Sequence, residues 1–415
     1  MGPEKKEARL RAGYEDSYDE AVADFEAFRR QTCERLASQW SDPPGKAKPR
    51  PCPACGKAAR VRKYGVERRI VTRFGEVSAK RNYHVCSCGH GFYPKDEELG
   101  FDEDNLSRDV LARVLDFVVS DTFEASRERL RLHHGIELSE TKLRHLFERQ
   151  SAPLADREKP CPVAPLPLTK ANAHQPVVIE CDGSMVRQTR GFGEVKLFGV
   201  QVLGETKRVF LAEAKDKDRF EAQLFESPGF EKLSKREVLW IGDGQPYNWG
   251  LKRRLCPQAR ELVDFYHVME HAHQAAKALF GDGDACADLY ARRVSRLLLS
   301  GEIETLFDEL KACIPYQPRT KAGKKEEAVL RPLLKYLKGN RNRLDYKGFR
   351  ERGWPMGSGA IESAHKWVIQ KRMKQAGMCW SPRNAQRMAT LRALRASVGI
   401  ERFAEMLEQA NRMAA

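Results

Sequence analysis

The 415-residue sequence lacks any long hydrophobic run. No apolar stretch approaches the roughly 18 to 20 residues that a helix needs to cross a bilayer. The first residues, from Met1 to Glu7, lack the apolar core of a secretory signal peptide. There is also no internal repeat along the chain. We therefore expect a cytoplasmic protein of several globular domains, with no membrane partner.

Acidic residues are fewer than basic ones. The chain carries 73 Lys and Arg against 58 Asp and Glu, a formal net charge of +15. Such an excess suits a polyanionic partner, because each phosphate that a cation neutralises releases condensed counterions. Many basic proteins bind no nucleic acid, so charge favours this partner without establishing it.

Cysteine is plentiful, with 11 residues, but a cytoplasmic chain seldom uses it for disulfides. Four cysteines lie close together, in a Cys-x-x-Cys-Gly turn and in a second pair separated by one residue. The first turn suits half of a tetrahedral zinc site, whereas the second pair departs from the usual spacing, and His90 could replace Cys86 there. We interpret residues 46–100 as a zinc ribbon with one structural Zn²⁺. The favoured ligands are Cys52, Cys55, Cys86 and Cys88.

Helical patterns flank this segment. Residues 1–45 predict an N-terminal helix that ends near Trp40, followed by a proline-rich linker. Residues 101–152 predict a helix-turn-helix, with Gly135 in the turn and Ser139 capping the second helix. Lys142 and Arg144 on that second helix would face DNA. Residues 153–175 form a second proline-rich linker.

The next part of the chain predicts an α/β fold. Between residues 176 and 270, three strand-like runs are followed by two helix–strand pairs, which is the order of an RNase H-like mixed sheet. A basic helical insertion over residues 271–350 interrupts this core. The core resumes at residues 351–398 and is followed by a C-terminal helix over residues 399–415. The predicted strands are 177–182, 195–203, 208–214, 238–243 and 261–266.

Three carboxylates stand in separate motifs. Asp182 and Asp243 each end an apolar run and precede a glycine, and Glu362 follows the turn Gly357-Ser358-Gly359. Ligands of open α/β sheets bind where strands end. Each Asp-Gly pair alone is more simply turn chemistry. Together with Glu362, the two aspartates favour a site for two divalent ions about 4 Å apart, flanking a phosphodiester.

These motifs are also recognisable. Residues 176–398 resemble the DDE transposases of bacterial insertion sequences, particularly the ISKra group. The segment from Gly357 to Glu362 is similar to that group's Gly-Ser-Gly-x-x-Glu signature, and the segment from Arg372 to Trp380 resembles its Arg-x-Lys-x-x-Gly-Met-x-Trp run. The resemblance implies a catalytic triad that ligates two Mg²⁺ or Mn²⁺ ions. Its members would be Asp182, Asp243 and Glu362.

Further side chains are assigned around this triad. The segment from Asp264 to His267 resembles the family's Asp-Phe-Tyr-His, which favours an auxiliary role for His267 over a role at the start of its own helix. Lys366 lies four residues after Glu362 and either pairs with it or contacts a phosphate. The basic surface would continue through Lys371, Arg372 and Lys374, although such a run is usually just a solvated face.

The sequence as a whole predicts a transposase that binds double-stranded DNA at terminal inverted repeats and at the target. It would catalyse two-metal-ion strand cleavage and strand transfer, and associate with the nucleoid when bound to DNA. The resemblance also implies a homo-oligomer. The alternatives are a domesticated, non-catalytic DNA-binding protein and an RNase H-like structure-specific nuclease.

Overall fold

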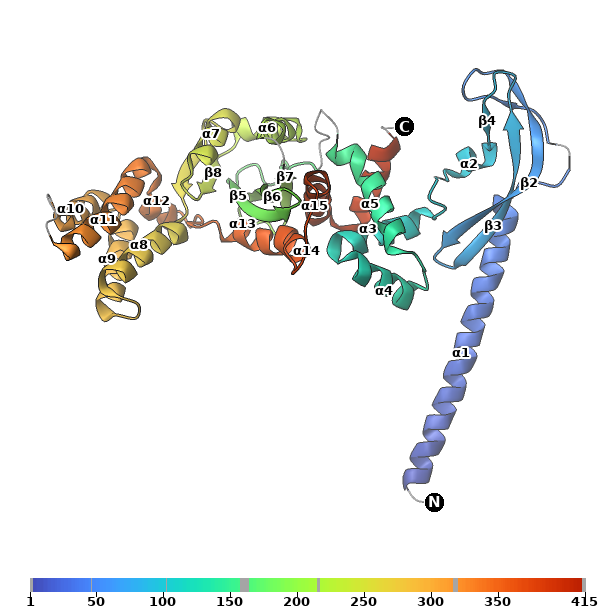
Figure 1. Cartoon of the computed structure of the whole chain (residues 1–415), viewed down its shortest axis with the longest axis horizontal. Coiled ribbons are helices and arrows are strands. Elements are labelled where there is room, and N and C mark those ends of the chain that lie inside the picture. The colour runs from blue at the N-terminus through green and yellow to red at the C-terminus, as the bar shows by residue number, and fades with distance from the viewer. Residues whose placement is uncertain are drawn as a thin grey trace. The chain divides into compact units, whose positions relative to one another are not determined.

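The computed structural model describes residues 3–45, 47–101, 103–156, 164–214, 217–315 and 320–412 (Figure 1). The chain divides into two compact units, Met1–Phe147 and Glu148–Ala415. Parts of the predicted linker (157–163) and of the predicted C-terminal helix (413–415) lie outside the described residues. Within the described ranges, no helix is both long enough and apolar enough to cross a membrane.

The first unit contains a long helix, an antiparallel sheet and several shorter helices. Its strands are ordered β1-β2-β3-β4, and each neighbouring pair is antiparallel. Helix α5 begins in this unit and ends in the second. The elements are α1 (Pro3–Trp40), β1 (Arg50–Pro51), β2 (Ala58–Thr72), β3 (Gly75–Val85), β4 (Gly91–Phe92), α2 (Pro94–Leu99), α3 (Arg108–Ser120), α4 (Phe123–His134) and α5 (Glu140–Ala155).

Helix α1 ends at Trp40, as predicted, because prolines follow within a few residues. Only its last part packs against the sheet. Arg29 Nε donates to the carbonyl of Phe74 at 3.0 Å, and the Cys33 thiol lies 3.4 Å from the same oxygen. The ring of Trp40 meets Phe101 edge-on at 5.1 Å.

The predicted pair of helices after α3 is present. Gly135, with φ of 61°, ends α4, and the Ser139 hydroxyl accepts the N–H of Lys142 at 3.2 Å to cap α5. The turn glycine and the serine cap are therefore confirmed. Helix α5 continues to Ala155, beyond residue 152, where the helix-turn-helix was predicted to end.

The second unit contains a mixed sheet and most of the helices. Figure 1 shows α8 to α12 gathered beside the sheet rather than over it. The elements are β5 (Val177–Gln188), β6 (Gly191–Val202), β7 (Arg208–Glu213), α6 (Lys217–Glu226), the 3₁₀-helix η1 (Phe230–Lys235), β8 (Val238–Gly242), α7 (Pro246–Leu255), β9 (Arg260–Val263), α8 (Phe265–Phe280), α9 (Ala285–Ser300), α10 (Ile303–Cys313), α11 (Lys321–Gly339), the 3₁₀-helix η2 (Arg341–Arg343), α12 (Tyr346–Glu351), α13 (Gly359–Ala364), the π-helix η3 (His365–Gln370), α14 (Lys371–Met373) and α15 (Pro382–Arg412).

The mixed α/β sheet predicted from the sequence is confirmed. Its order is β7-β6-β5-β8-β9: β5, β6 and β7 form an antiparallel meander, and β8 and β9 add in parallel. The interior strand β8 is buried at every position, as expected for a strand covered on both faces. Trp240 on β8 contacts Phe198 on β6 with ring centroids 5.7 Å apart.

Two boundaries differ from the prediction. Asp182 does not end a strand, because β5 continues to Gln188 as one arm of a hairpin with β6. The last strand stops at Val263 because Asp264 caps α8, so the helical insertion begins before residue 271. The predicted start of the C-terminal helix agrees with the structure: Gly399, with φ of 77° and ψ of 175°, breaks α15 with a kink, and a second helical segment follows it to Arg412.

Candidate functional site

Three aspartates lie in a row where the parallel strands of the second unit end. The pairing of β5 with β8 ends at Glu180 and Ile241, and its register, continued by two residues, aligns Asp182 with Asp243, one residue beyond the end of β8. The register between β8 and β9 then aligns Asp243 with Asp264. Neighbouring strands are about 4.8 Å apart, so these residues occupy adjacent positions at one edge of the sheet. We call Asp182, Asp243, Asp264 and Glu362 the acid edge.

Contacts around Cys181 show how closely the first two aspartates approach. The side-chain amide of Asn248 donates both to the Cys181 carbonyl at 3.3 Å and to Asp243 Oδ1 at 2.8 Å. Burial, and then the charges of Asp182 and Asp243, raise the pKa of the Cys181 thiol to about 12. Both carboxylates therefore lie within electrostatic reach of one buried atom, and Asn248 fixes the orientation of Asp243.

Asp264 is buried and fully engaged in holding the backbone. Its Oδ1 accepts the N–H groups of Tyr266 at 2.7 Å and His267 at 3.3 Å, which caps α8. Its Oδ2 accepts the N–H of Ser358 at 2.8 Å and also the Ser358 hydroxyl. Asp264 thus ties the end of β9 to the turn that precedes Glu362. The sequence motif from Asp264 to His267 indicated that this segment matters, but it did not predict the bond to Ser358.

Glu362 on α13 is electrostatically coupled to the aspartates. Burial first, and then the charges of Asp264 and Asp182, raise the pKa of Glu362, whereas Lys366 and His267 lower it. Helix α13 approaches the sheet closely because Gly199 on β6 has no side chain: a Cβ there would lie 3.1 Å from Ile361 Cδ1. Glu362 therefore lies within electrostatic reach of Asp264, Asp182, Lys366 and His267.

His365 was missed by the sequence reasoning. It is only 2% exposed, and its Nε2 lies 3.8 Å from Asp182 Oδ2. Within the described part of the chain, neither ring nitrogen has a hydrogen-bond partner. Burial lowers its pKa, so the neutral imidazole can offer an N–H to Asp182. His365 begins the π-helix η3, a rare distortion that occurs often at functional sites. Its position one helical turn after Glu362 was the only available signal.

The acid edge offers donors that suit hard cations, because carboxylate oxygen is the preferred ligand of Mg²⁺ and Mn²⁺. In the described part of the chain, only the four cysteines form a group of three or more ligand atoms that all lie within 4.8 Å of one another. The carboxylates of Asp182, Asp243 and Glu362 are therefore too far apart to bind one ion together. A pair of ions about 4 Å apart needs no such gathering, because each ion contacts only some of the carboxylates. The residue types and their alignment therefore fit a two-ion site.

Glu180 is a further buried acid, two residues before Asp182 on β5. Burial raises its pKa from 4.5 to about 8, with smaller contributions from Asp264 and Glu362, whereas Arg208 and the N–H of Ile361 lower it. The side chain is therefore protonated at neutral pH and adds no charge to the acid edge.

Glu180→Gln is expected to raise the melting temperature at pH 9 and to change it little at pH 5. The folded state retains a proton that the unfolded chain releases, so stability falls as pH rises from about 4.5 to about 8. Above that range, the loss is on the order of a few kcal/mol. Thermal denaturation without divalent ions, with Glu237→Gln on the exposed surface as control, measures the effect. An equal shift at both pH values would contradict it.

The four predicted zinc ligands of the first unit meet. Cys52 Sγ lies 3.8 Å from Cys88 Sγ, and Cys55 Sγ lies 3.5 Å from Cys86 Sγ. This cluster could hold a metal ion such as zinc. The ring of His90 instead stacks on Phe92 at 5.8 Å, so the geometry favours Cys86 as the fourth ligand.

Two tight turns position these thiols. The N–H of Gly56 donates to the Cys52 carbonyl at 2.8 Å, and the N–H of Gly89 donates to the Cys86 carbonyl at 3.0 Å. Both glycines have positive φ, 73° and 89°, which a larger residue adopts only with strain. The N–H of Cys88 lowers the pKa of the Cys86 thiol, which favours the thiolate that binds metal.

The predicted DNA-contacting residues have different environments. Lys366, Lys371 and Lys374 are exposed, as expected. Arg372 is only 1% exposed and lies over the ring of Trp380 at 5.0 Å. Its assignment to the basic surface was wrong, because the guanidinium fills part of the core beside that ring.

The two residues predicted on α5 lie at the surface of the first unit. Lys142 pairs with Asp104 at 2.9 Å, and Arg144 is exposed, with its guanidinium 5.8 Å from the ring of Phe123. Their contact with DNA stays a prediction.

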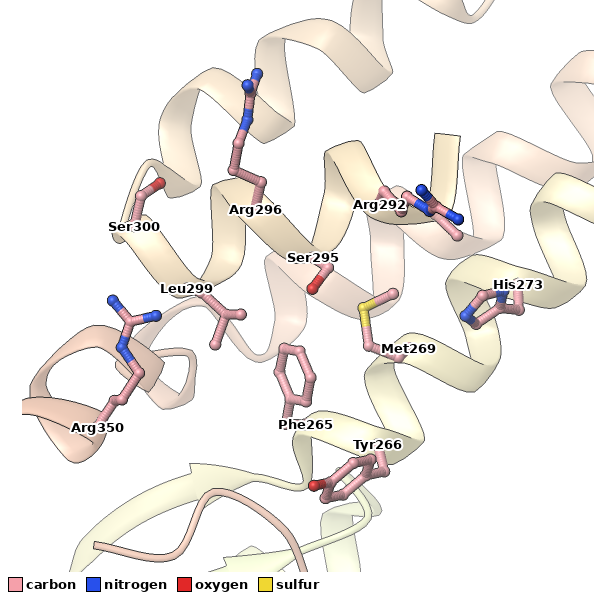
Figure 2. Close-up of a pocket in the computed structure, with 11 residues that line it drawn as sticks. Phe265, Tyr266, Met269, His273, Arg292, Ser295, Arg296, Leu299, Ser300 and Arg350 are labelled. Carbon is pink, nitrogen blue, oxygen red and sulfur yellow. The ribbon is translucent and has the colours of Figure 1, made fainter. Parts of the chain in front are cut away.

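A cavity of about 700 Å³ opens between α8, α9 and α12. Figure 2 shows Arg292 and Arg296 on α9, Arg350 on α12, and the rings of Phe265 and Tyr266 near the start of α8. All three arginines are exposed. The cavity adjoins the acid edge, because the Tyr266 ring packs so closely on Gly357 that a Cβ there would lie 2.5 Å from it.

Comparisons with known proteins add little to this description. No protein-family model matches the chain, and no curated protein matches it. Among solved structures, the chain is similar to one titled "Drosophila P element transposase strand transfer complex", with 12% sequence identity and a TM-score of 0.38. The similarity covers 76% of this chain and 96% of that chain.

Proposed function

We propose that this protein is a DDE transposase of an insertion sequence, with an RNase H-like core related to the ISKra group. The observation that carries the proposal is the alignment of Asp182 with Asp243 at one edge of a mixed sheet, with Glu362 electrostatically coupled to that edge. The strand order, an antiparallel meander followed by two parallel strands, supports the RNase H-like assignment. The signature from Gly357 to Glu362 supports the family.

Asp182, Asp243 and Glu362 would hold two Mg²⁺ or Mn²⁺ ions. When bound, such ions activate an attacking hydroxyl and stabilise the leaving oxygen of a phosphodiester. The protein's own groups orient these carboxylates: Asn248 holds Asp243, and His365 lies against Asp182.

Other residues complete the arrangement. Asp264 fixes the turn at Ser358 and thereby the start of α13, which carries Glu362. Lys366 and His267 lie within electrostatic reach of Glu362 and would contact the substrate phosphate, with His267 in an auxiliary role.

DNA recognition would use several exposed basic regions. The cysteine-bearing sheet and the pair α4 and α5 would bind the terminal inverted repeats, with Lys142 and Arg144 toward the DNA. Lys366, Lys371 and Lys374, with the arginines of the cavity beside α8, would contact the phosphate backbone near the acid edge. A transposase must bring two DNA ends together, so we propose that it acts as a homo-oligomer.

A strand-transfer assay with Mg²⁺ or Mn²⁺ tests this function. The substrates are a labelled duplex carrying the element's end and a target plasmid. We expect strand cleavage at the element end and joining of the freed 3′ end to the plasmid. Cleavage without joining would favour the structure-specific nuclease, and binding without cleavage would favour a domesticated DNA-binding protein. An absence of binding would refute all three.

A further inference from the structure

Helix α1 carries a row of apolar side chains that the described residues of the first unit leave exposed. They follow one another at intervals of four, three, four and three residues, and we call them the aromatic stripe. Its four rings are 67%, 58%, 58% and 53% exposed. The first two rings stack at 6.1 Å, which shows that they share a face. The members of the stripe are Tyr14, Tyr18, Ala21, Phe25 and Phe28.

The stripe is separate from the part of α1 that packs on its own sheet. Arg29 and the Cys33 thiol both contact the carbonyl of Phe74, in the turn between β2 and β3, and Thr32 beside them is buried. Figure 1 shows the remainder of α1 extending away from the sheet as a single helix. A solitary helix is marginally stable in water, because most helical stability comes from packing an apolar face. The stripe therefore needs a partner.

The spacing indicates which kind of partner. Alternating intervals of four and three residues repeat every seven residues, as in the a and d positions of a coiled coil. Tyr18 and Phe25 occupy a, and Tyr14, Ala21 and Phe28 occupy d. A repeat of 3.5 residues per turn keeps one seam facing a second helix along its whole length.

The charge of this segment excludes DNA as the partner. Between residues 14 and 28 there is no Lys or Arg. Such a surface repels phosphate, although the whole chain is basic. The acids in this segment are Glu15, Asp16, Asp19, Glu20, Asp24 and Glu26.

We propose that the aromatic stripe binds the same stripe of a second copy of this chain, in a parallel two-stranded coiled coil. In that arrangement Asp24, at position g, lies opposite Arg29 of the second copy, at position e, and their charges are complementary, although this guanidinium also binds Glu26 and the Phe74 carbonyl within its own chain. Four of the six acids fall at the outer positions b, c and f, and Glu15 meets no acid across the seam. Each residue of the stripe packs against the same residue of the second copy, and Ala21 forms a small layer between the aromatic layers.

The available area is consistent with a dimer. An aromatic side chain presents ~150–250 Å², so four rings at half to two-thirds exposure offer on the order of 400 Å² per helix. Two helices then contribute on the order of 800 Å², and Ala21, Val22 and the stems of flanking side chains bring the total toward the ~1,200 Å² of a small stable interface. The proposal does not depend on the catalytic assignment.

The test is the mass of the full-length protein in solution, measured by light scattering after size exclusion over a concentration series. Wild type is expected to be dimeric at micromolar concentrations. Phe25→Asp should weaken association at least ~100-fold, because two rings leave the seam and two charges enter it. Ala23→Asp adds the same charge on the outer face, at position f, and should remain dimeric.

A second variant tests the proposal independently, in case Phe25→Asp misfolds. Ala21→Cys places a thiol at the seam, where mild oxidation should join two copies through a disulfide. Ala23→Cys on the outer face should not cross-link, and it also reports any background from the native cysteines. A monomeric wild type, a dimer that persists in Phe25→Asp, or cross-linking of Ala23→Cys equal to that of Ala21→Cys would each overturn the proposal.

Discussion

Asp182→Asn, Asp243→Asn and Glu362→Gln are each expected to lower Mg²⁺-dependent strand cleavage by at least ~1,000-fold, equivalent to ~4 kcal/mol of transition-state stabilisation. Each change removes the charge of one carboxylate and keeps the shape of the side chain. Binding of the DNA end should change by less than ~3-fold, because backbone phosphates are bound mainly by exposed basic residues. Single-turnover cleavage and a gel-shift titration measure the two quantities.

The control for these variants is Glu237→Gln. Glu237 is an exposed acid beside the start of β8 and pairs with Arg260, far along the strand from the acid edge. The Glu237→Gln variant should cleave DNA at the wild-type rate. If any of the three variants cleaves at that rate, the residue does not belong to the site. Asp264→Asn provides a contrast: it should also lower the melting temperature, because Asp264 holds backbone groups rather than ions.

Removal of the metal from the cysteine cluster is expected to unfold the sheet β1–β4 and to abolish binding of the DNA end. The apolar core around the cluster is small, comprising Cys52, Ala59, Cys86 and Phe92. A structural zinc ion contributes ~10–16 kcal/mol of apparent binding free energy in small domains, far more than such a core supplies. Cys52→Ala should therefore have the same effect as a chelator.

Three measurements check this expectation. Metal analysis should find one zinc ion per chain in wild type and none in Cys52→Ala. Limited proteolysis should then cut within residues 47–101 while sparing the second unit. Cys286→Ser, which changes an exposed cysteine outside the cluster, should behave as wild type. A chelator that strips zinc and leaves this sheet resistant to protease would show that the cluster is not structural.

Local patterns in the sequence predicted the elements of this fold well. Apolar runs located the strands, and Gly135 and Ser139 marked a turn and a cap correctly, because those signals act within a few residues. The extent of β5 beyond Asp182 was not visible, since it depends on pairing with β6 rather than on an apolar run. The burial of Arg372 could not be predicted for a similar reason, because the ring that it packs against belongs to Trp380, eight residues away.

Residues that position the acid edge were the hardest to find. Asp264 bonds to Ser358 across 94 positions of sequence, and His365 faces Asp182 across a still longer separation. No periodicity relates such pairs. The four cysteines were predictable because two pairs of thiols close together in the sequence are typical of a zinc site, even though the second pair departs from the usual spacing. Carbonyl, amide and imidazole contacts have no such sequence pattern.

The hydrogen bond between Asp264 and Ser358 holds together the two ends of the segment 265–357. The N–H of Phe265 also donates to the carbonyl of Met356 at 2.9 Å, so the chain leaves the sheet and returns to it at neighbouring points. The helices α8 to α12 thus form a closed lobe on a narrow base. A change in the length of this lobe would therefore leave the contacts at its base in place. Because Glu362 follows the lobe along the chain, a product that ends within the lobe would lack one member of the proposed triad.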